Sequence, residues 1–213
     1  MTHSGSLIRA DNVSSLNTAG IKAMWDYGVK AVLDLRSEQE IAKFPSPFVP
    51  ADYGPLYLHV PLVDDAFADE LAKTPAMADR YRLMLDHRQE ALGQIFKTIA
   101  RVDGPLVFHC FAGKDRTGLV AAMVLGLLGV DDETIANDYA ATATVVDLLL
   151  ARLHARAPDR EPPGPRIMSA EASTMHAALD WMRIRHGSVE GYTRAHGLTT
   201  TEISALRDTM IEP

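Results

Sequence analysis

The sequence has only one cysteine, Cys110, among its 213 residues. One cysteine cannot form an internal disulfide, which is typical of proteins that fold in a reducing compartment. The N-terminus also lacks the charged head and apolar run of a cleaved signal peptide. Together these absences predict a cytoplasmic protein and leave open secretion by another route.

Positive charge is in deficit as well. The chain carries 21 Lys and Arg against 28 Asp and Glu, a formal net charge of −7. Nucleic-acid-binding domains show clusters of basic residues, so nucleic acid is not an expected partner. No apolar stretch reaches the ~18 residues that indicate a membrane-spanning helix, so no membrane span is expected. Any positive field that attracts an anionic substrate must therefore be local.

Repeats, low-complexity tracts and metal-ligand spacing among the eight histidines are also absent, so no metal or other cofactor is expected. The 47% hydrophobic content is enough for one sizeable core. We predict a single α/β domain over residues 1–213, with a short, mainly parallel sheet flanked by helices. The sheet and its loops occupy about 1–157, and a C-terminal helical part occupies about 166–213. The oligomeric state cannot be predicted from these features.

Apolar patterns locate the expected elements. Short apolar runs predict strands at Leu7-Ile8, Val29–Leu35, Tyr57–Leu62 and Leu106–Phe108. Helical spacing and caps predict helices from Thr18 to Gly28, 64–75, 77–100, 119–128, 131–139, 142–157 and after Ser169, Ser188 and Thr199. We expect the last three helices to pack against the sheet. Residues 158–165 hold four prolines and a glycine and are expected to form a linker or mobile loop.

The stretch from His109 to Gly118 joins a predicted strand to a predicted helix. Backbone N–H groups that curve into a helix N-terminus suit an anion of phosphate size. Gly113 permits the sharp turn, and Arg116 can hold two oxygens of a tetrahedral anion. Lys114 adds a second positive charge and so favours a substrate with several anionic groups. Backbone donors of the loop, at Phe111 and Ala112 among others, complete the predicted substrate-binding set with Thr117.

The positive charge of Arg116 and the helix N-terminus also acts on the sulfur of Cys110. A thiol with an ordinary pKa of about 8.5 becomes a thiolate when it faces a helix N-terminus and a guanidinium. A thiolate beside a phosphate cradle predicts attack on phosphorus and a phosphocysteine that water hydrolyses. We also expect Thr117 to donate a hydrogen bond to the sulfur, and His109 to support the loop from behind.

The leaving oxygen of such a reaction needs a proton. Asp115 lies inside the loop and is the preferred general acid, which would act as base toward water in the second step. Asp64 and Asp65 follow a predicted strand and are the alternatives.

Upstream, Asp34 and Arg36 are predicted to form an ion pair that supports neighbouring loops. We expect Glu40 to join this pair. The alternative is that Asp34 and Arg36 contact the substrate directly.

The residues of the loop resemble the signature of a known family of enzymes. Cys110 to Arg116 fit the Cys-x5-Arg pattern of the protein tyrosine phosphatase superfamily, and the His-Cys-x-x-Gly-Lys-Asp-Arg-Thr-Gly string is similar to a bacterial branch that includes mycobacterial phosphatases. The segments Leu7-Ile8-Arg9, 32–37 with Glu40, and Asn137-Asp138-Tyr139 are also similar to that family. The resemblance implies the fold of these phosphatases, a three-layer sandwich.

The resemblance also implies an activity. It implies metal-free hydrolysis of phosphotyrosine, of phosphoserine or phosphothreonine, and of phosphoinositides. Cys110 would be the nucleophile, Arg116 the clamp on the transition state, Asp115 the acid and base, and Lys114 an additional anion contact. The implied partners are therefore phosphorylated proteins or phosphoinositides. The segment around 157–167 is short for an elaborate lid.

Two alternatives belong to other functional classes. A catalytically silent phosphate-binding module would use the same loop, but it has no need of Cys110, Asp115 and Arg116 together. A sulfurtransferase or arsenate reductase would also use a thiolate. The first has no use for an acid beside the sulfur, and the second usually needs further cysteines, which this chain lacks.

Overall fold

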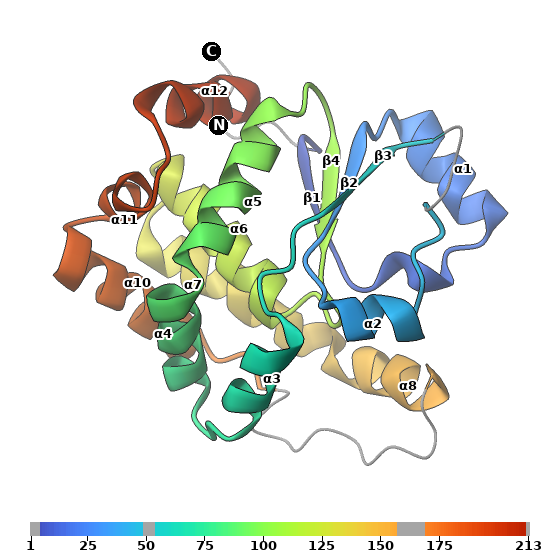
Figure 1. Ribbon diagram of the computed structural model, residues 1–213, viewed down its shortest axis with the longest axis horizontal. Coiled ribbons are helices and arrows are strands. Elements are labelled where there is room, and N and C mark those ends of the chain that lie inside the picture. Colours follow the sequence, from blue (N-terminus) through green and yellow to red (C-terminus); the bar gives the residue numbers. More distant parts are fainter. Residues whose placement is uncertain (1–4, 49–53, 157–168, 212–213) are drawn as a thin grey trace.

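A four-stranded parallel sheet forms the centre of the molecule. The computed structural model describes residues 5–48, 54–156 and 169–211, and Figure 1 shows their arrangement. In spatial order the strands are β1 (Leu7–Ala10), β4 (Leu106–His109), β2 (Ala31–Asp34) and β3 (Leu56–His59). All neighbouring pairs are parallel, which confirms the α/β class and the parallel sheet.

The strand register brings the carboxyl ends of all four strands to one edge. His109, at the end of β4, pairs with Ala10 on one side and with Asp34 on the other, and Asp34 pairs in turn with His59. In sheets of this kind a ligand binds at the carboxyl edge, beside the strand where the chain order reverses. Cys110 follows β4 directly, between β1 and β2.

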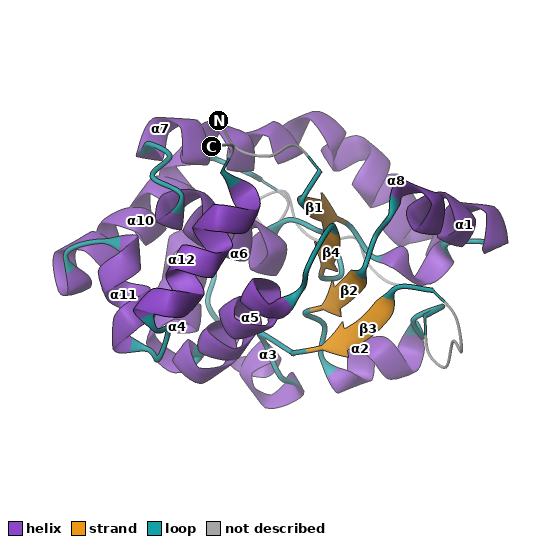
Figure 2. Ribbon diagram, turned by 90° about the horizontal axis from the view of Figure 1, so that it is seen from above, coloured by secondary structure: helices purple, strands orange, loops and turns teal. Residues whose placement is uncertain are grey.

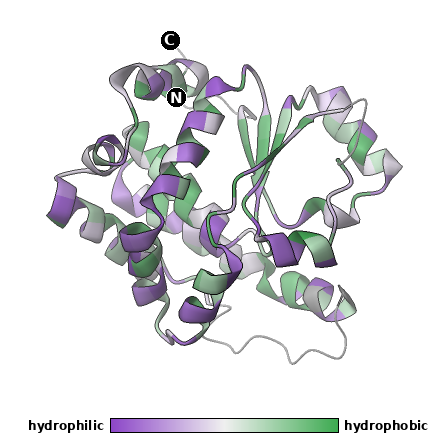
Figure 3. Cartoon of the chain, in the orientation of Figure 1, coloured by the Kyte–Doolittle hydropathy of each residue, from purple (hydrophilic) through white to green (hydrophobic). Residues whose placement is uncertain are grey.

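Each face of the sheet is covered by helices. Val32 and Val107 pack in a cluster with Ile21 and Met24 of α1 (Thr18–Tyr27). The alternate strand residues, represented by Phe108, face the larger core, which contains the buried sides of α5 (Gln89–Arg101) and α6 (Asp115–Leu127). Figure 2 shows the sheet between these helices, and in Figure 3 the centre is largely hydrophobic while hydrophilic residues gather on the outer helices.

The remaining helices surround this arrangement. Their bounds are η1 (Val13–Ser15), α2 (Glu38–Lys43), α3 (Asp65–Ala72), α4 (Met77–His87), α7 (Asp132–Ala140), η2 (Ala141–Val145), α8 (Val146–Arg156), α10 (Ala172–His186), α11 (Val189–Ala195) and α12 (Thr200–Met210). The C-terminal helices pack mainly on other helices: α10 on α4 and α7, α11 on α6, and α12 on α5. The prediction that they pack against the sheet is therefore wrong, because α5 and α6 already cover that face.

One long helix predicted from Met77 to about Ala100 is in fact two. The chain leaves the helical conformation at Arg88, between α4 and α5. The Arg88 side chain donates from Nε to the carbonyl of Leu62 at 2.9 Å and from Nη1 to Asp64 Oδ2 at 2.6 Å. The apolar spacing continues across the break, so periodicity alone could not reveal it.

Several predicted helix ends agree with the structure. Gly28 and Gly187 have the left-handed conformation that ends α1 and α10, and Ser188 caps α11. Thr199 and Glu202 form the predicted capping box of α12. The N-terminal caps predicted at Thr18 and Ser169 are wrong: Asn17 caps α1, and α10 begins at Ala172 without a side-chain cap.

The predicted proline-rich linker at 158–165 lies outside the described residues. Among the helices that the structure does describe, none is long and apolar enough to cross a membrane.

Candidate active site

The loop after β4 is pressed against β1. Gly113 has φ 66°, and a Cβ at this position would lie 2.7 Å from the carbonyl oxygen of Ala10, so only glycine fits. The Gly113 carbonyl accepts a hydrogen bond from Arg9 Nε at 3.1 Å. The predicted sharp turn at Gly113 is confirmed, and the turn leads directly into α6.

Arg9 ties this loop to distant parts of the chain. Its Nη1 lies 3.1 Å from Asp138 Oδ2 on α7, and its Nη2 donates to Thr142 Oγ1 at 2.9 Å. Two segments singled out for their resemblance, 7–9 and 137–139, thus meet at the loop although 129 positions separate Arg9 from Asp138.

Cys110 is a free, buried cysteine with 2% of its surface exposed. His109 Nδ1 donates to the carbonyl of Cys110 at 3.0 Å, so the predicted support from behind the loop is confirmed. Burial lowers the pKa of His109, which keeps the ring neutral. The Thr117 hydroxyl is buried and has no hydrogen-bond partner in the described part of the chain, so the predicted bond to the sulfur is absent from this structure.

Arg116 is bound by Glu40 of α2. Its Nη1 and Nη2 donate to the two oxygens of the Glu40 carboxylate at 2.5 and 2.7 Å. Burial opposes the charge on Arg116, but Glu40 and the neighbouring Cys110 sulfur outweigh this effect and raise the pKa of Arg116. Arg116 is therefore always cationic.

Glu40 owes its position to a helix start. Ser37 and Glu40 form a capping box at the start of α2, in which Glu40 Oε2 also accepts from the Ser37 backbone N–H at 2.9 Å. Burial acts to raise the pKa of Glu40, yet the hydrogen bonds and charge of Arg116 lower it. Glu40 joins the Asp34–Arg36 network only through charge, since Arg36 also helps to lower the pKa of Glu40, whereas its hydrogen bonds go to Arg116 and to the backbone of Ser37.

Lys114 and Asp115 follow the turn. The Lys114 ammonium is buried, donates to the carbonyl oxygen of Ser169 at 2.9 Å and lies 3.2 Å from Asp115 Oδ1. The same Oδ1 accepts from the Tyr81 hydroxyl at 3.0 Å. Asp115 is partly exposed, with 31% of its side-chain surface accessible. Its carboxyl group therefore has one oxygen held by neighbours and retains access to solvent.

Asp64 and Asp65, the alternative acids, lie at the start of α3. Asp64 caps that helix through the Phe67 N–H at 2.9 Å and pairs with Arg88. The backbone hydrogen bond from Phe67, with the pairing to Arg88, lowers the pKa of Asp64. A carboxyl group with a lowered pKa is a poor proton donor at neutral pH, which disfavours Asp64 as a general acid.

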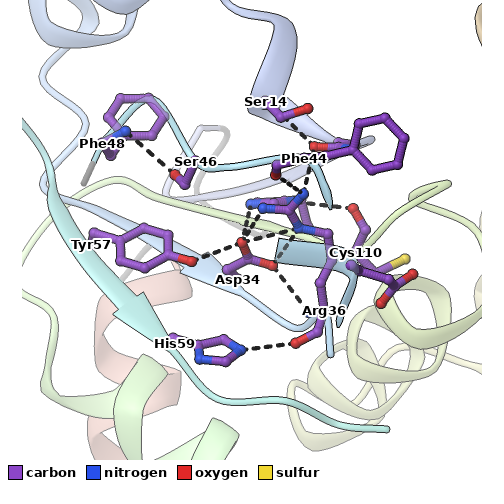
Figure 4. Close-up of polar contacts among 12 residues, drawn as sticks. Ser14, Asp34, Arg36, Phe44, Ser46, Phe48, Tyr57, His59 and Cys110 are labelled. Carbon is purple, nitrogen blue, oxygen red and sulfur yellow. Dashed lines mark hydrogen bonds and ion pairs between the residues drawn. The ribbon is translucent and has the colours of Figure 1, made fainter. Parts of the chain in front are cut away.

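Asp34 and Arg36 form the predicted ion pair, and both are fully buried. Arg36 donates from Nη2 to Asp34 Oδ2 at 2.6 Å and from Nη1 to the carbonyl of Phe44 at 2.8 Å, and Tyr57 also donates to Asp34 (Figure 4). Burial acts to raise the pKa of Asp34, but Arg36 outweighs it and lowers the pKa. This pair supports the loops next to Cys110, as the first interpretation of the sequence predicted.

A pair of aromatic rings and a cavity also border the loop. The rings of Phe111 and Phe44 are in contact, with centroids 5.4 Å apart, and both are partly exposed. On the β1 side, Ala112 and Gly113 line a cavity of about 320 Å³ whose other walls include Leu148 of α8. No lining residue on α8 was predicted as part of the site.

Three further residues escaped prediction. The sequence placed Glu40 with Asp34 and Arg36 and did not pair it with Arg116, and it gave Tyr81 and Tyr139 no role in the chemistry. A signal existed for Glu40, because Ser-x-x-Glu is the pattern of a capping box. For Tyr139 the signal was the resemblance of the segment Asn137-Asp138-Tyr139 to the family. None existed for Tyr81, whose hydroxyl partners depend on how three helices pack. In the described ranges, no three His, Cys, Asp or Glu side chains are grouped so that they could hold a metal ion.

Comparison with known proteins identifies the family of the chain. The family model described as "Tyrosine phosphatase family" matches residues 1–212. The chain is similar to a tyrosine-protein phosphatase of Nostoc commune, with 30% identity over 94% of this chain and 72% of the relative. It is also similar to the triple specificity protein phosphatase PtpB of Mycobacterium tuberculosis, with 27% identity over 97% of this chain and 91% of the relative.

Proposed function

Because the chain belongs to the tyrosine phosphatase family and is a phosphatase, we propose that it hydrolyses phosphate monoesters through a phosphocysteine formed on Cys110. The observation that carries this proposal is the arrangement of Arg116. Its guanidinium is fixed by Glu40 and stands in the first turn of the helix that follows the Cys110 loop. A guanidinium held beside a helix N-terminus is an arrangement that binds a phosphoryl anion.

In the first step the Cys110 sulfur attacks phosphorus. The S–P bond forms while the bond from phosphorus to the leaving oxygen breaks, and protonated Asp115 gives its proton to that oxygen. The negative charge that spreads over the phosphoryl oxygens is stabilised by Arg116 and by the N–H groups at the start of α6. Lys114, at the N-cap position of α6, makes no side-chain hydrogen bond to the first turn, which leaves those groups available to an anion.

In the second step a water molecule replaces the leaving group. Asp115, now a carboxylate, accepts a proton from this water as its oxygen attacks phosphorus. The S–P bond breaks, inorganic phosphate leaves, and Cys110 returns to the thiolate. Asp115 is again protonated, so the cycle closes without a metal ion or an oxidant.

Phosphotyrosine is the substrate class we favour. The partly exposed Phe44–Phe111 ring pair beside the loop offers an aromatic surface to an aryl leaving group. The specificity stated in the name of the mycobacterial relative supports testing phosphoserine and phosphothreonine proteins as well. The sequence suggested that the charge of Lys114 favours phosphoinositides, but its ammonium is buried and donates to the carbonyl of Ser169, so the structure gives no preference for them over phosphotyrosine.

A catalytically silent phosphate-binding module is the second candidate. It would use the same backbone donors and Arg116 without chemistry. The presence of Cys110 and Asp115 beside them favours the enzyme, since a module that only binds phosphate has no use for a nucleophile or a proton donor.

The test is hydrolysis of para-nitrophenyl phosphate in EDTA by the wild type and by Cys110→Ser. We expect turnover by the wild type and loss of turnover in the variant, with phosphate still bound by both. A phosphotyrosine peptide, a phosphoserine peptide and phosphoinositide vesicles complete the substrate panel. Phosphate binding without any turnover by the wild type would favour the binding module, and equal turnover by Cys110→Ser would exclude the cysteine mechanism.

A further inference from the structure

Two buried tyrosines stand behind Asp115. The Tyr81 hydroxyl on α4 lies 3.0 Å from Asp115 Oδ1 and 2.9 Å from the hydroxyl of Tyr139 on α7. The exposed fractions of the two residues are 0% and 1%, and their rings meet edge to face with centroids 6.0 Å apart. Tyr81 thus contacts the carboxyl group of Asp115 directly, and Tyr139 is linked to it through the Tyr81 hydroxyl.

The direction of these hydrogen bonds follows from the donors. Tyr81 has one proton, and an ionised carboxylate can only accept. Tyr81 therefore donates to Asp115, and Tyr139 donates to the oxygen of Tyr81. Burial and the charge of Asp115 raise the pKa of both phenols, so both remain protonated donors across the neutral range.

The two oxygens of Asp115 have different surroundings. Oδ1 faces both the Tyr81 hydroxyl and the Lys114 ammonium, the latter at 3.2 Å. Within the described ranges, Oδ2 accepts no hydrogen bond. One oxygen is thus fixed by donors while the other stays available to carry a proton.

Gly118 allows Tyr139 to take part. A Cβ at position 118 would lie 3.0 Å from Cδ2 and 3.2 Å from Cε2 of Tyr139, closer than ordinary contact. A larger residue on this turn of α6 would displace the Tyr139 ring and its hydroxyl. The final glycine of the loop motif therefore has a role in packing that the loop itself does not explain.

We propose that Tyr81, backed by Tyr139, is a positioning residue that holds Oδ1 of Asp115 and leaves Oδ2 to exchange the proton with the leaving group and with water. The proposal rests on the proposed function, in which Asp115 is the acid and base. While Oδ2 gives its proton to the leaving oxygen, the hydrogen bond from Tyr81 to Oδ1 keeps the carboxyl group in one orientation. It also prevents the side chain from rotating away before water attacks.

The test compares Tyr81→Phe with the wild type on aryl phosphates that span good and poor leaving groups. Good leaving groups need little protonation, so we expect a small change there. For poor leaving groups we expect kcat to fall by about 10-fold to 100-fold, part of the usual contribution of general acid catalysis. Tyr139→Phe should give a smaller change in the same direction, and it carries the test if Tyr81→Phe does not fold.

Tyr192→Phe is the matched control. Tyr192 is a buried tyrosine whose hydroxyl donates to the carbonyl of Leu85 on α4 at 2.7 Å, and no hydrogen bond joins it to Asp115. Its loss should lower stability without changing the dependence of kcat on the leaving group. If Tyr81→Phe slowed all substrates equally, as a purely structural residue would, the proposal would be overturned.

The failure of this inference is distinguishable from the failure of the proposed function. Without wild-type turnover, or with full turnover by Cys110→Ser, the proposed function fails and the role of Tyr81 fails with it. If instead Asp115→Asn selectively slows poor leaving groups while Tyr81→Phe and Tyr139→Phe do not, the function stands and only the tyrosine inference is overturned.

Discussion

Arg116 and Glu40 lie 76 positions apart and form a two-point ion pair, with N–O distances of 2.5 and 2.7 Å. Glu40 is itself fixed by the backbone N–H of Ser37. The guanidinium is therefore oriented before any phosphate arrives, and this lowers the cost of ordering it in the transition state. Arginine has five N–H donors, so those not directed at Glu40 remain for a ligand.

Glu40→Gln tests this orientation. The amide keeps one acceptor oxygen but loses the charge and the second acceptor, so Arg116 should no longer be held in one position. We expect kcat/KM for a phosphotyrosine peptide to fall by about 100-fold, as for other misplaced active-site groups. Glu38→Gln, on the same helix but with 78% of its side-chain surface exposed, is the control and should leave kcat/KM unchanged. Equal effects of the two variants would contradict the orientation role.

Asp115→Asn tests the identity of the general acid. Asparagine keeps the shape but cannot give a proton, so poor leaving groups should slow by about 100-fold or more while good leaving groups change little. The parallel variant Asp64→Asn should not alter this dependence, because Asp64 is occupied by the α3 cap and by Arg88. Steady-state kinetics on a series of aryl phosphates would measure both. Uniform slowing by Asp115→Asn would move the acid role to Asp64 or Asp65.

Lys114→Met separates two roles of the lysine. The sequence predicts that the positive charge of Lys114 makes an additional contact to polyanionic substrates. In the structure the ammonium is buried and donates to the carbonyl of Ser169. We therefore expect the variant to lower kcat/KM by the same factor for a phosphotyrosine peptide and for a phosphoinositide. A selectively larger loss on the phosphoinositide would instead establish Lys114 as a contact to additional phosphates.

Features formed by residues close together in the sequence could be predicted, whereas contacts between distant segments could not. The loop from Cys110 to Arg116 could be predicted because its glycine, its charges and its strand-to-helix setting lie within a few residues of one another. The pairing of Arg116 with Glu40 could not, because the Ser37–Glu40 pattern locates the start of a helix but does not show which loop that helix faces. The break at Arg88 and the direction of the Lys114 side chain depend on contacts with Leu62 and Ser169, which no periodicity encodes.

Arg36→Met tests the support beneath the loop. Removal of one partner from a buried ion pair leaves the other charge unpaired, which costs about 3–5 kcal/mol. We expect a loss of this size in the free energy of unfolding, measured by urea denaturation. Lys22→Met is the matched control, because the Lys22–Asp26 pair is exposed and should contribute at most about 0.5 kcal/mol. Losses of similar size in the two variants would contradict the view that Asp34 depends on Arg36.

Acid should weaken the fold through two carboxyl groups. The pKa of Asp34 and the pKa of Glu40 lie below their ordinary values of 3.8 and 4.5, because Arg36 and Arg116 hold the carboxylates. In the unfolded chain both groups take up protons at higher pH than in the folded protein. The free energy of unfolding should therefore be constant with respect to these groups above about pH 5.5, and it should fall as the pH drops through 4.5 and 3.8.

The Glu40→Gln variant isolates one part of this effect. Since position 40 no longer titrates, the variant should show a shallower decline in the free energy of unfolding between about pH 5.5 and pH 3. The difference in stability between wild type and variant should thus be largest near neutral pH and shrink in acid. Urea denaturation at a series of pH values measures both curves. Parallel curves would mean that Glu40 binds its proton equally well in the folded and unfolded chains, and that its ion pair with Arg116 only offsets the cost of burying the carboxylate.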